Sequence, residues 1–108
     1  MGFFDALTGP DIHMGVEEWK RTPGSVLLDV RTPDEYRQGH IPGSLNVELN
    51  GLQSILDRIP DKNTPLFVHC LSGARSGRAV QALGRMGYRN VKNIGGISRY
   101  RGKLAEGK

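Results

Sequence analysis

One stretch of the sequence combines residue types that could do covalent chemistry: FVHCLSGARSGRA, residues 67–79. It holds Cys70, the only cysteine of the 108-residue chain, and Arg75 follows a short distance later. A cysteine thiolate is a strong nucleophile, and helix N-termini or nearby cations lower the thiol pKa from about 8.5 to about 3.5–7.5. These residue types therefore predict a reactive thiol rather than an inert buried one.

The residues after the cysteine are expected to form a loop, Leu71 to Arg75, between a strand that ends at Cys70 and a helix that begins near Arg75 or Ser76. Gly73 allows backbone torsions that other residues resist. The loop can therefore turn successive N–H groups inward as an anion-binding nest. The helix adds the positive end of its dipole and its unsatisfied amides. Arg75 adds a cation with a fork of donors for an anionic substrate.

The histidines indicate neither a general base nor a metal site. Side chains alternate along a strand, so His69 is expected to point away from Cys70 and to have a core or supporting role. His13 has no ligand partner nearby in sequence and is expected at the surface. Three scattered histidines and one cysteine make no recognised zinc pattern.

The elements that must position the thiol alternate along the chain. The runs SVLLDV and PLFVHC are consecutively apolar, as in strands buried on both faces of a parallel sheet. Thr32, Pro33 and Glu35 form a capping box at the start of a helix that ends at Gly39. Strands are expected over 12–14, 25–30, 44–49, 65–70 and 91–94, and helices over 16–20, 33–38, 51–59 and 75–86, with a last short helix after 95.

This alternation predicts an α/β fold with a central parallel sheet of about five strands and helices on both faces. Such sheets bind ligands beyond the carboxyl ends of their strands. Cys70 and the residues from Asp29 to Arg31 both lie at expected strand ends. The predicted fold thus places the cysteine where this architecture has its chemistry.

The composition is that of an ordinary globular protein, with 37% apolar and 24% charged residues, and 108 residues are most simply one domain. No apolar run approaches the ~18 residues of a membrane span, so no membrane partner is expected. The start, MGFFDALTGPD, lacks the basic region of a secretory signal. A single cysteine favours a reducing compartment, so we expect a cytoplasmic protein.

Charge is distributed unevenly along the chain. Residues 1–74 hold six Lys or Arg against ten Asp or Glu, whereas residues 75–108 hold nine against one. A basic final third attracts an acidic protein or a small anion, or is simply a solvated surface. Nucleic acid is not expected, because the basic residues are spaced out and no RNP-like motif is present.

The stretch LLDVRTPDEYRQGHIPGSLNV (27–47), followed by CLSGARS (70–76) and NIGGI (93–97), resembles the rhodanese domain of sulfurtransferases. The resemblance covers about residues 10–100 and leaves short extensions at both ends of a single domain, 1–108. It implies a thiosulfate sulfurtransferase that needs no metal or organic cofactor. Such an enzyme moves a sulfane sulfur from thiosulfate or a persulfide donor to a thiophilic acceptor, such as cyanide or a thiol.

The resemblance also assigns roles to residues of this chain. Cys70 is the nucleophile and carries the sulfur as a persulfide, and the Arg75 side chain binds the sulfonate of thiosulfate. Asp29, Arg31 and His40 match signature positions and are interpreted mainly as supports of the strand-end loops. The charged sulfur is held by the backbone amides of the loop residues Leu71, Ser72, Gly73, Ala74 and Arg75.

Partners follow from the same chemistry: a small anionic sulfur donor, and a thiol acceptor such as thioredoxin or glutathione. We expect a monomer. The sequence departs from the family at Ser98-Arg99-Tyr100, where many relatives carry Trp or another aromatic residue, and it lacks the usual closing Gly-x-Pro.

Two other functions compete with sulfur transfer. A non-enzymatic sulfur-relay or regulatory module would dock a protein through the basic third. A tyrosine phosphatase or arsenate reductase would also use a cysteine in an anion-binding loop. However, phosphatase loops place five residues between Cys and Arg, whereas Leu71 to Ala74 are four. One cysteine also excludes arsenate reduction through an internal disulfide.

Overall fold

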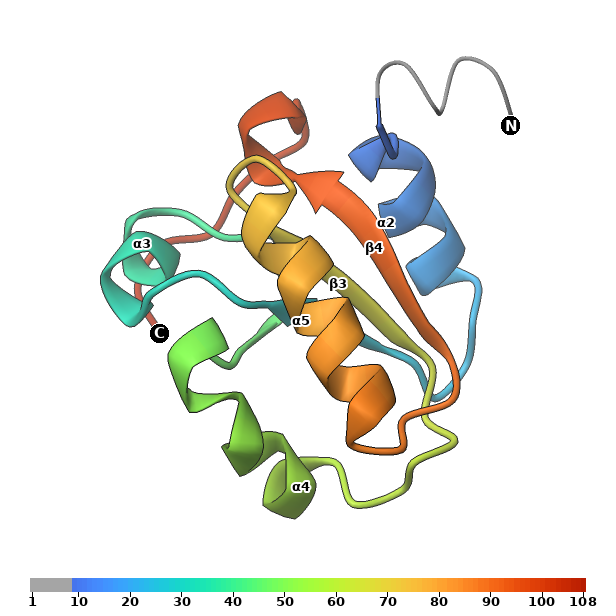
Figure 1. The fold of residues 1–108 in the computed structure, drawn as a ribbon. Helices are drawn as coiled ribbons and strands as arrows, with labels where there is room; N and C mark the ends of the chain where they lie inside the picture. Colours follow the sequence, from blue (N-terminus) through green and yellow to red (C-terminus); the bar gives the residue numbers. More distant parts are fainter. Residues whose placement is uncertain (1–8) are drawn as a thin grey trace.

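A single parallel sheet organises the chain (Figure 1). The computed structural model describes residues 9–108. Its four strands lie in the order β2-β1-β3-β4, and each neighbouring pair is parallel. The strands are β1 (Val26–Asp29), β2 (Leu45–Asn46), β3 (Leu66–Cys70) and β4 (Val91–Gly96).

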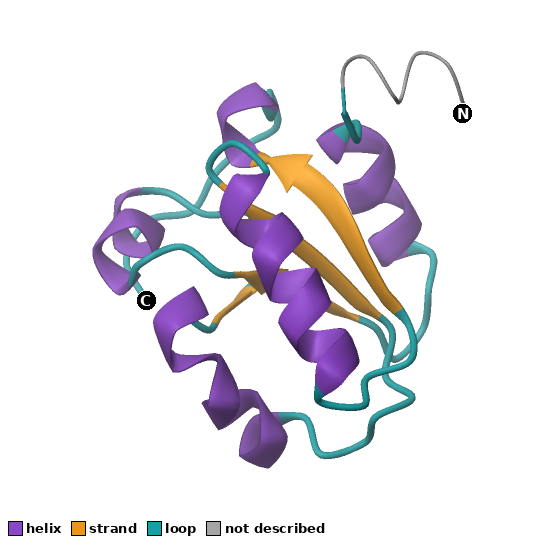
Figure 2. Cartoon of the chain, in the orientation of Figure 1, coloured by secondary structure: helices purple, strands orange, loops and turns teal. Residues whose placement is uncertain are grey.

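Helices cover both faces of this sheet, as predicted. Helix α2 packs on one face, and α5 packs on the other beside α4 (Figure 2). The chain between β1 and β2 forms α3. One short 3-10 helix precedes α4, and another follows β4. The helical elements are α2 (Ile12–Lys20), α3 (Pro33–Gln38), η1 (Leu49–Ser54), α4 (Ile55–Arg58), α5 (Ala74–Arg85) and η2 (Ile97–Arg99).

The alternation of side chains along the strands divides the apolar interior into two cores. Leu28 and Val68 face α5 and pack with Leu83, whereas Leu27 and Phe67 pack in the other core, which contains residues of α2. Burial on both faces explains the consecutive apolar runs, because each position of these central strands meets a covering helix.

The expected strand over 12–14 was wrong, so the sheet has four strands rather than five. Residue Ile12 already begins α2, because the Asp11 side chain caps this helix by accepting a hydrogen bond from the His13 amide at 2.9 Å. An N-cap aspartate satisfies one of the free amides at a helix start and so favours the helix over an extended segment.

Two other boundaries also differ from the prediction. The strand expected over 44–49 is only the two residues of β2. The helix expected over 51–59 is the 3-10 helix η1 followed by one turn of α4, with non-helical torsions at Gly51. A glycine within this segment lowers its helix propensity, so tertiary contacts of its apolar side chains set its shape.

Three strand ends meet on one side of the sheet and place the loops that follow β1, β3 and β4 together. The register pairs Asp29 with His69 and Cys70 with Gly96.

Within residues 9–108, no helix is both long and apolar enough to cross a membrane. The expectations for the N-terminal extension concern residues 1–8 and lie outside the described part of the chain.

Close packing between α2 and β4 generates a stability prediction. Replacing a helical glycine by alanine ordinarily stabilises a helix by about 0.5–1 kcal/mol. At Gly15, however, the new Cβ would lie 2.3 Å from Ile94 Cβ. We therefore expect Gly15→Ala to lower the free energy of unfolding by about 1–3 kcal/mol, measured by urea denaturation.

The matched control is Gly84→Ala in α5, where no atom lies within 4 Å of the added Cβ. This variant should keep or raise the free energy of unfolding, by up to about 1 kcal/mol. Equal effects of the two substitutions would contradict the proposed contact between α2 and β4.

Candidate active site

The thiol of Cys70 lies at the carboxyl end of β3, buried beneath the loop that follows it. Two backbone amides donate to its sulfur, from Gly73 at 3.0 Å and from Ser76 at 3.3 Å. The Ser76 hydroxyl lies 3.4 Å from the same sulfur. The sulfur is therefore surrounded by donors that match a negative charge.

These contacts lower the pKa of the Cys70 thiol below its ordinary value. Burial alone raises the pKa, because it disfavours the charged thiolate. Hydrogen bonds from the Ser76 hydroxyl and from the amides of Ser76, Gly73 and Ser72 together outweigh burial. The thiolate therefore gains population at neutral pH, which is the form that acts as a nucleophile.

The loop is shorter than predicted. Helix α5 begins at Ala74, so only Leu71, Ser72 and Gly73 lie between strand and helix. Gly73 has φ 108°, a left-handed conformation that glycine adopts without steric cost, as the sequence predicted. This turn directs the amides of Gly73 and Ser76 at the sulfur. Among residues 9–108, the amides of Leu71, Ala74 and Arg75 do not donate to the Cys70 sulfur itself. Their predicted contact is with the transferred sulfur atom of the persulfide.

Ser76 and Asn93 were not identified from the sequence, yet they hold the base of the loop. The buried Ser76 hydroxyl lies 2.8 Å from Asn93 Oδ1 and 3.1 Å from the Gly73 carbonyl. Asn93 Nδ2 also donates to the Gly73 carbonyl, at 3.3 Å. The signal for Ser76 was a hydroxyl residue in the first turn of the helix, but nothing local in the sequence links it to Asn93.

Gly96 was also missed as a site residue. A Cβ at Gly96 would lie 2.3 Å from the Leu71 carbonyl oxygen and 2.6 Å from Ser72 Cα. The end of β4 can therefore approach the loop this closely only with glycine. Just beyond it, the Ser98 amide donates to the same Leu71 carbonyl at 3.0 Å and joins η2 to the loop.

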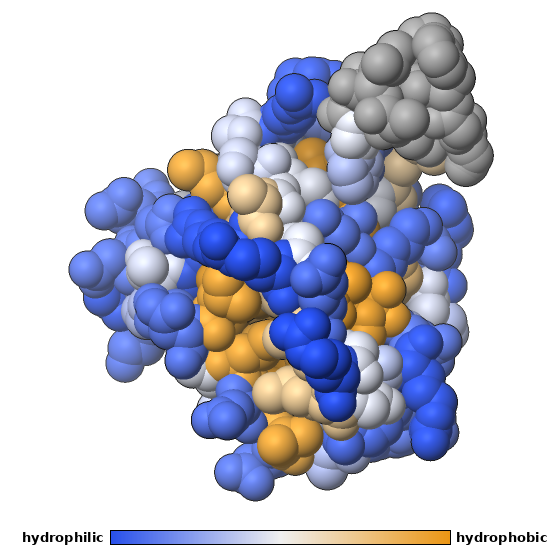
Figure 3. Space-filling view, in the orientation of Figure 1, coloured by the Kyte–Doolittle hydropathy of each residue, from blue (hydrophilic) through white to orange (hydrophobic). Residues whose placement is uncertain are grey.

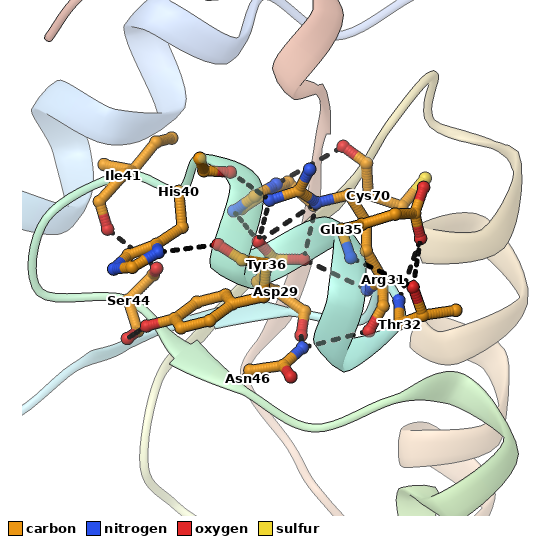
Figure 4. A network of polar contacts seen from close by, with 12 residues as sticks. Asp29, Arg31, Thr32, Glu35, Tyr36, His40, Ile41, Ser44, Asn46 and Cys70 are labelled. Carbon is orange, nitrogen blue, oxygen red and sulfur yellow. Dashed lines mark hydrogen bonds and ion pairs between the residues drawn. The ribbon is translucent and has the colours of Figure 1, made fainter. Parts of the chain in front are cut away.

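A buried ion pair supports the neighbouring strand end, at β1 (Figure 4). Arg31 Nη2 donates to Asp29 Oδ2 at 2.8 Å and to the Gly39 carbonyl at 2.7 Å. The Asp29 side chain is fully buried, and that of Arg31 is 6% exposed. The pair ties the end of β1 to the segment after α3, which agrees with the structural interpretation of these two residues.

The three histidines all make contacts away from the sulfur. His40 stacks on Tyr36 with ring centroids 3.7 Å apart and donates to the Tyr36 carbonyl through Nδ1 at 2.8 Å (Figure 4). His69 is buried and faces Asp29, with Nε2 3.8 Å from Oδ2, so it points away from Cys70 as expected. Burial is the main cause that lowers the His69 pKa.

His13 connects α2 to the segment after η2. Its Nε2 accepts a hydrogen bond from the Arg101 amide at 2.9 Å, and its ring stacks on Tyr100 with centroids 5.2 Å apart. The prediction of a surface position holds, since about a third of the side chain is exposed. Tyr100, one of the three residues where the sequence was expected to depart from the family, is thereby fixed against α2.

Arg75 does not extend freely toward the thiol. Its Nη1 donates to Glu35 Oε1 at 2.8 Å and its Nη2 donates to Oε2 at 3.0 Å. Glu35 is the capping-box residue of α3, and its role in pairing was not predicted. The hydrogen bond from Arg75 is the largest cause that lowers the Glu35 pKa, to about 2.

Together these residues place hydrogen-bond donors around one buried thiol. The donors are backbone amides and a hydroxyl, which stabilise developing negative charge without consuming a proton. Among residues 9–108, no group of three His, Cys, Asp or Glu side chains is arranged to hold a metal ion. The site is thus suited to attack by a thiolate and to holding a small anionic group above the loop.

Comparisons with known proteins agree with this geometry. The family described as "Rhodanese-like domain" matches residues 14–103. The chain is 41% identical over 71 residues to "Thiosulfate sulfurtransferase PspE" of Escherichia coli (strain K12), covering 65% of this chain and 68% of that protein. It is 39% identical over 77 residues to a "Sulfurtransferase" of Allochromatium vinosum, covering 70% of this chain and 71% of that protein.

A solved structure supports the same conclusion about the fold. The structure described as "rhodanese with anions from E. coli" superposes with a TM-score of 0.71 at 36% sequence identity. The superposition covers 77% of this chain and 99% of that one.

The hydroxyl of Ser76 gives a testable pH dependence. A hydrogen bond to a charged group contributes about 1.5–3 kcal/mol, so Ser76→Ala should raise the thiol pKa and slow alkylation by iodoacetamide at pH 7 about tenfold. The measurement is the pH–rate profile of alkylation. Ser98→Ala keeps the backbone bond to the loop and serves as the control. An unchanged profile in Ser76→Ala would mean that the amides alone stabilise the thiolate.

The buried pair at β1 predicts a loss of stability. Asp29→Asn leaves the Arg31 charge buried without its partner, and this should lower the free energy of unfolding by about 3–5 kcal/mol. The matched control is Asp34→Asn, which removes an exposed ion pair with Arg37 and should cost less than about 1 kcal/mol. Similar losses in urea denaturation would contradict a structural role for Asp29.

Proposed function

Because this chain belongs to the rhodanese-like domain family, we propose that it is a sulfurtransferase that carries a sulfane sulfur on Cys70 as a persulfide. The observation that carries the proposal is the pair of backbone amides that donate to a buried cysteine sulfur at 3.0 and 3.3 Å, with the Ser76 hydroxyl 3.4 Å from the same sulfur. A structural cysteine requires no such donors. A thiolate nucleophile does, because burial without them would keep the thiol protonated.

The proposed reaction has two steps and needs no cofactor. In the first, the Cys70 thiolate attacks the outer sulfur of thiosulfate. A sulfur–sulfur bond forms to Cys70, the bond to the sulfonate sulfur breaks, and sulfite leaves with both electrons of that bond. In the second step, a nucleophilic acceptor attacks the outer sulfur of the persulfide and restores the Cys70 thiolate. With cyanide as the acceptor, the product is thiocyanate.

The loop supplies the stabilisation that these steps require. When the outer sulfur carries the negative charge, we infer that the amides of Leu71 to Arg75 hold it, and that remaining N–H groups of Arg75 contact a sulfonate. The resemblance to a rhodanese described as solved with anions supports this assignment. Both steps move one charge between atoms close to the loop, which preorganised donors stabilise without rearrangement.

A persulfide donor would load the same thiolate, and a thiol such as thioredoxin or glutathione would unload it. The basic final third includes exposed residues of α5 and of the segment after η2, which would attract acidic partners. We therefore retain sulfur relay to a docked protein as the alternative function. It differs from the main proposal in the acceptor, not in the chemistry of Cys70.

Intact-mass measurement tests the first step. The reduced protein is incubated with thiosulfate and should gain the mass of one sulfur atom, which cyanide then removes as thiocyanate. Cys70→Ser should gain nothing, because the chain has no other cysteine. Ser98→Ala should load like the parent protein.

Loading from a persulfide but not from thiosulfate would keep the persulfide chemistry of Cys70 and would exclude thiosulfate as the donor. If neither donor loads the parent protein although it is folded, the sulfurtransferase proposal is wrong. If Cys70→Ser also gains the mass of one sulfur atom, the sulfur binds to another residue and the proposed role of Cys70 is wrong.

A further inference from the structure

The ion pair between Arg75 and Glu35 changes the charge that an incoming sulfur donor meets. Both terminal nitrogens of Arg75 are engaged by the two carboxylate oxygens, at 2.8 and 3.0 Å. About 30% of each side chain is exposed, so the pair lies at the surface beside the loop. A donor therefore meets a neutral pair and not an isolated cation.

A second guanidinium, that of Arg31 just after β1, is neutralised in the same way. Arg31 is buried against Asp29, and neither charge faces solvent. The loop itself contributes backbone amides and the uncharged side chains of Leu71 and Ser72, of which Leu71 is exposed. In the space-filling view, pale and apolar surface lies around the start of α5, between hydrophilic surfaces over α3 and η2 (Figure 3). The donors closest to the sulfur thus carry partial charges only.

Glu35 is held in this position by its own helix. Its Oε1 accepts from the Thr32 amide at 2.9 Å, which completes the capping box of α3. The same oxygen accepts from Arg75. Because the cap fixes the carboxylate, Arg75 cannot leave the pair without breaking a contact to a rigid element. The pKa of Glu35, lowered to about 2 chiefly by Arg75, keeps the carboxylate charged at neutral pH.

Two classes of sulfur donor differ in how much they need a free cation here. Thiosulfate is a dianion and releases sulfite, also a dianion, when the Cys70 thiolate takes its outer sulfur. When the Cys70 thiolate attacks the outer sulfur of a thiol persulfide RSSH, the sulfur–sulfur bond of the donor breaks and its electron pair goes to the inner sulfur. The inner sulfur takes up the proton that the transferred outer sulfur releases, and it leaves as the thiol RSH. The first reaction brings two negative charges to the mouth of the site, and the second brings at most one, that of an ionised persulfide.

We propose that Glu35 is a specificity-determining residue that neutralises Arg75 and thereby favours thiol persulfides over thiosulfate as sulfur donors. The inference rests on the proposed function, because it concerns the choice of donor for the Cys70 thiolate. Glu35 acts through Arg75 and is a positioning residue rather than a catalytic one.

The test compares loading rates from thiosulfate and from the persulfide of β-mercaptoethanol, followed by intact mass. Glu35→Gln keeps a side-chain acceptor for the Thr32 amide, so the capping box survives, but it removes the charge that offsets Arg75. Loading from thiosulfate should become about tenfold faster, as expected for a freed charge-assisted contact. Loading from the persulfide should change much less, so the ratio of the two rates is the readout.

Asp34→Asn is the matched control, since it removes the same charge from the same helix but pairs with Arg37 instead of Arg75. It should load at the parental rates. In the double variant Glu35→Gln/Arg75→Gln the gain should disappear, because it arises from Arg75. The gain should also shrink with rising ionic strength, since the freed cation is partly exposed. Thermal unfolding of each variant checks that it is folded.

Slower loading from thiosulfate in folded Glu35→Gln would show that Glu35 only holds Arg75 in a productive position, and would overturn the inference. An unchanged ratio of the two donors would overturn it as well. If the parent protein accepts sulfur from neither donor, the proposed function fails and the inference with it. These outcomes are distinct, because the first two require that the parent protein loads.

Discussion

The hydrogen bonds to the sulfur of Cys70 are the constraint on which the rest of the site depends. A thiol buried at the end of a central strand is normally protonated, because burial disfavours its charged form. Here the amides of Gly73 and Ser76 and the Ser76 hydroxyl oppose burial and lower the thiol pKa. Contacts from the neighbouring segments hold the loop that carries these donors.

Two neighbouring segments brace the loop from different sides. On the β4 side, Asn93 contacts the Ser76 hydroxyl. Gly96, which has no side chain, allows the end of β4 to contact the loop backbone closely. On the α3 side, Glu35 joins the capping box of that helix to Arg75. The buried Asp29–Arg31 pair anchors the adjoining end of β1. The loop is thereby fixed by elements from distant parts of the sequence.

The same contacts separate two roles that the sequence had assigned to one region. The amides and the hydroxyl, not Arg75, make the largest contributions that lower the Cys70 pKa. Arg75 is instead held by Glu35. In the proposed reaction, activation of the nucleophile and recognition of the donor thus depend on different groups, so substitutions are expected to change one without the other.

The sequence by itself determined the local features of this protein. The apolar runs predicted β1 and β3, and the capping box predicted α3. The position of Cys70 at a strand end and the left-handed turn at Gly73 were also predicted. Each of these features depends on residues close together in the chain. Where a cap and a strand pattern competed, as at Asp11 and Ile12, the prediction failed. Only the tertiary structure decided that Arg75 meets Glu35, that Ser76 meets Asn93 and that Gly96 meets Leu71. Those contacts join segments that are far apart in sequence, and their geometry follows from the parallel register of the strands, which no local pattern encodes.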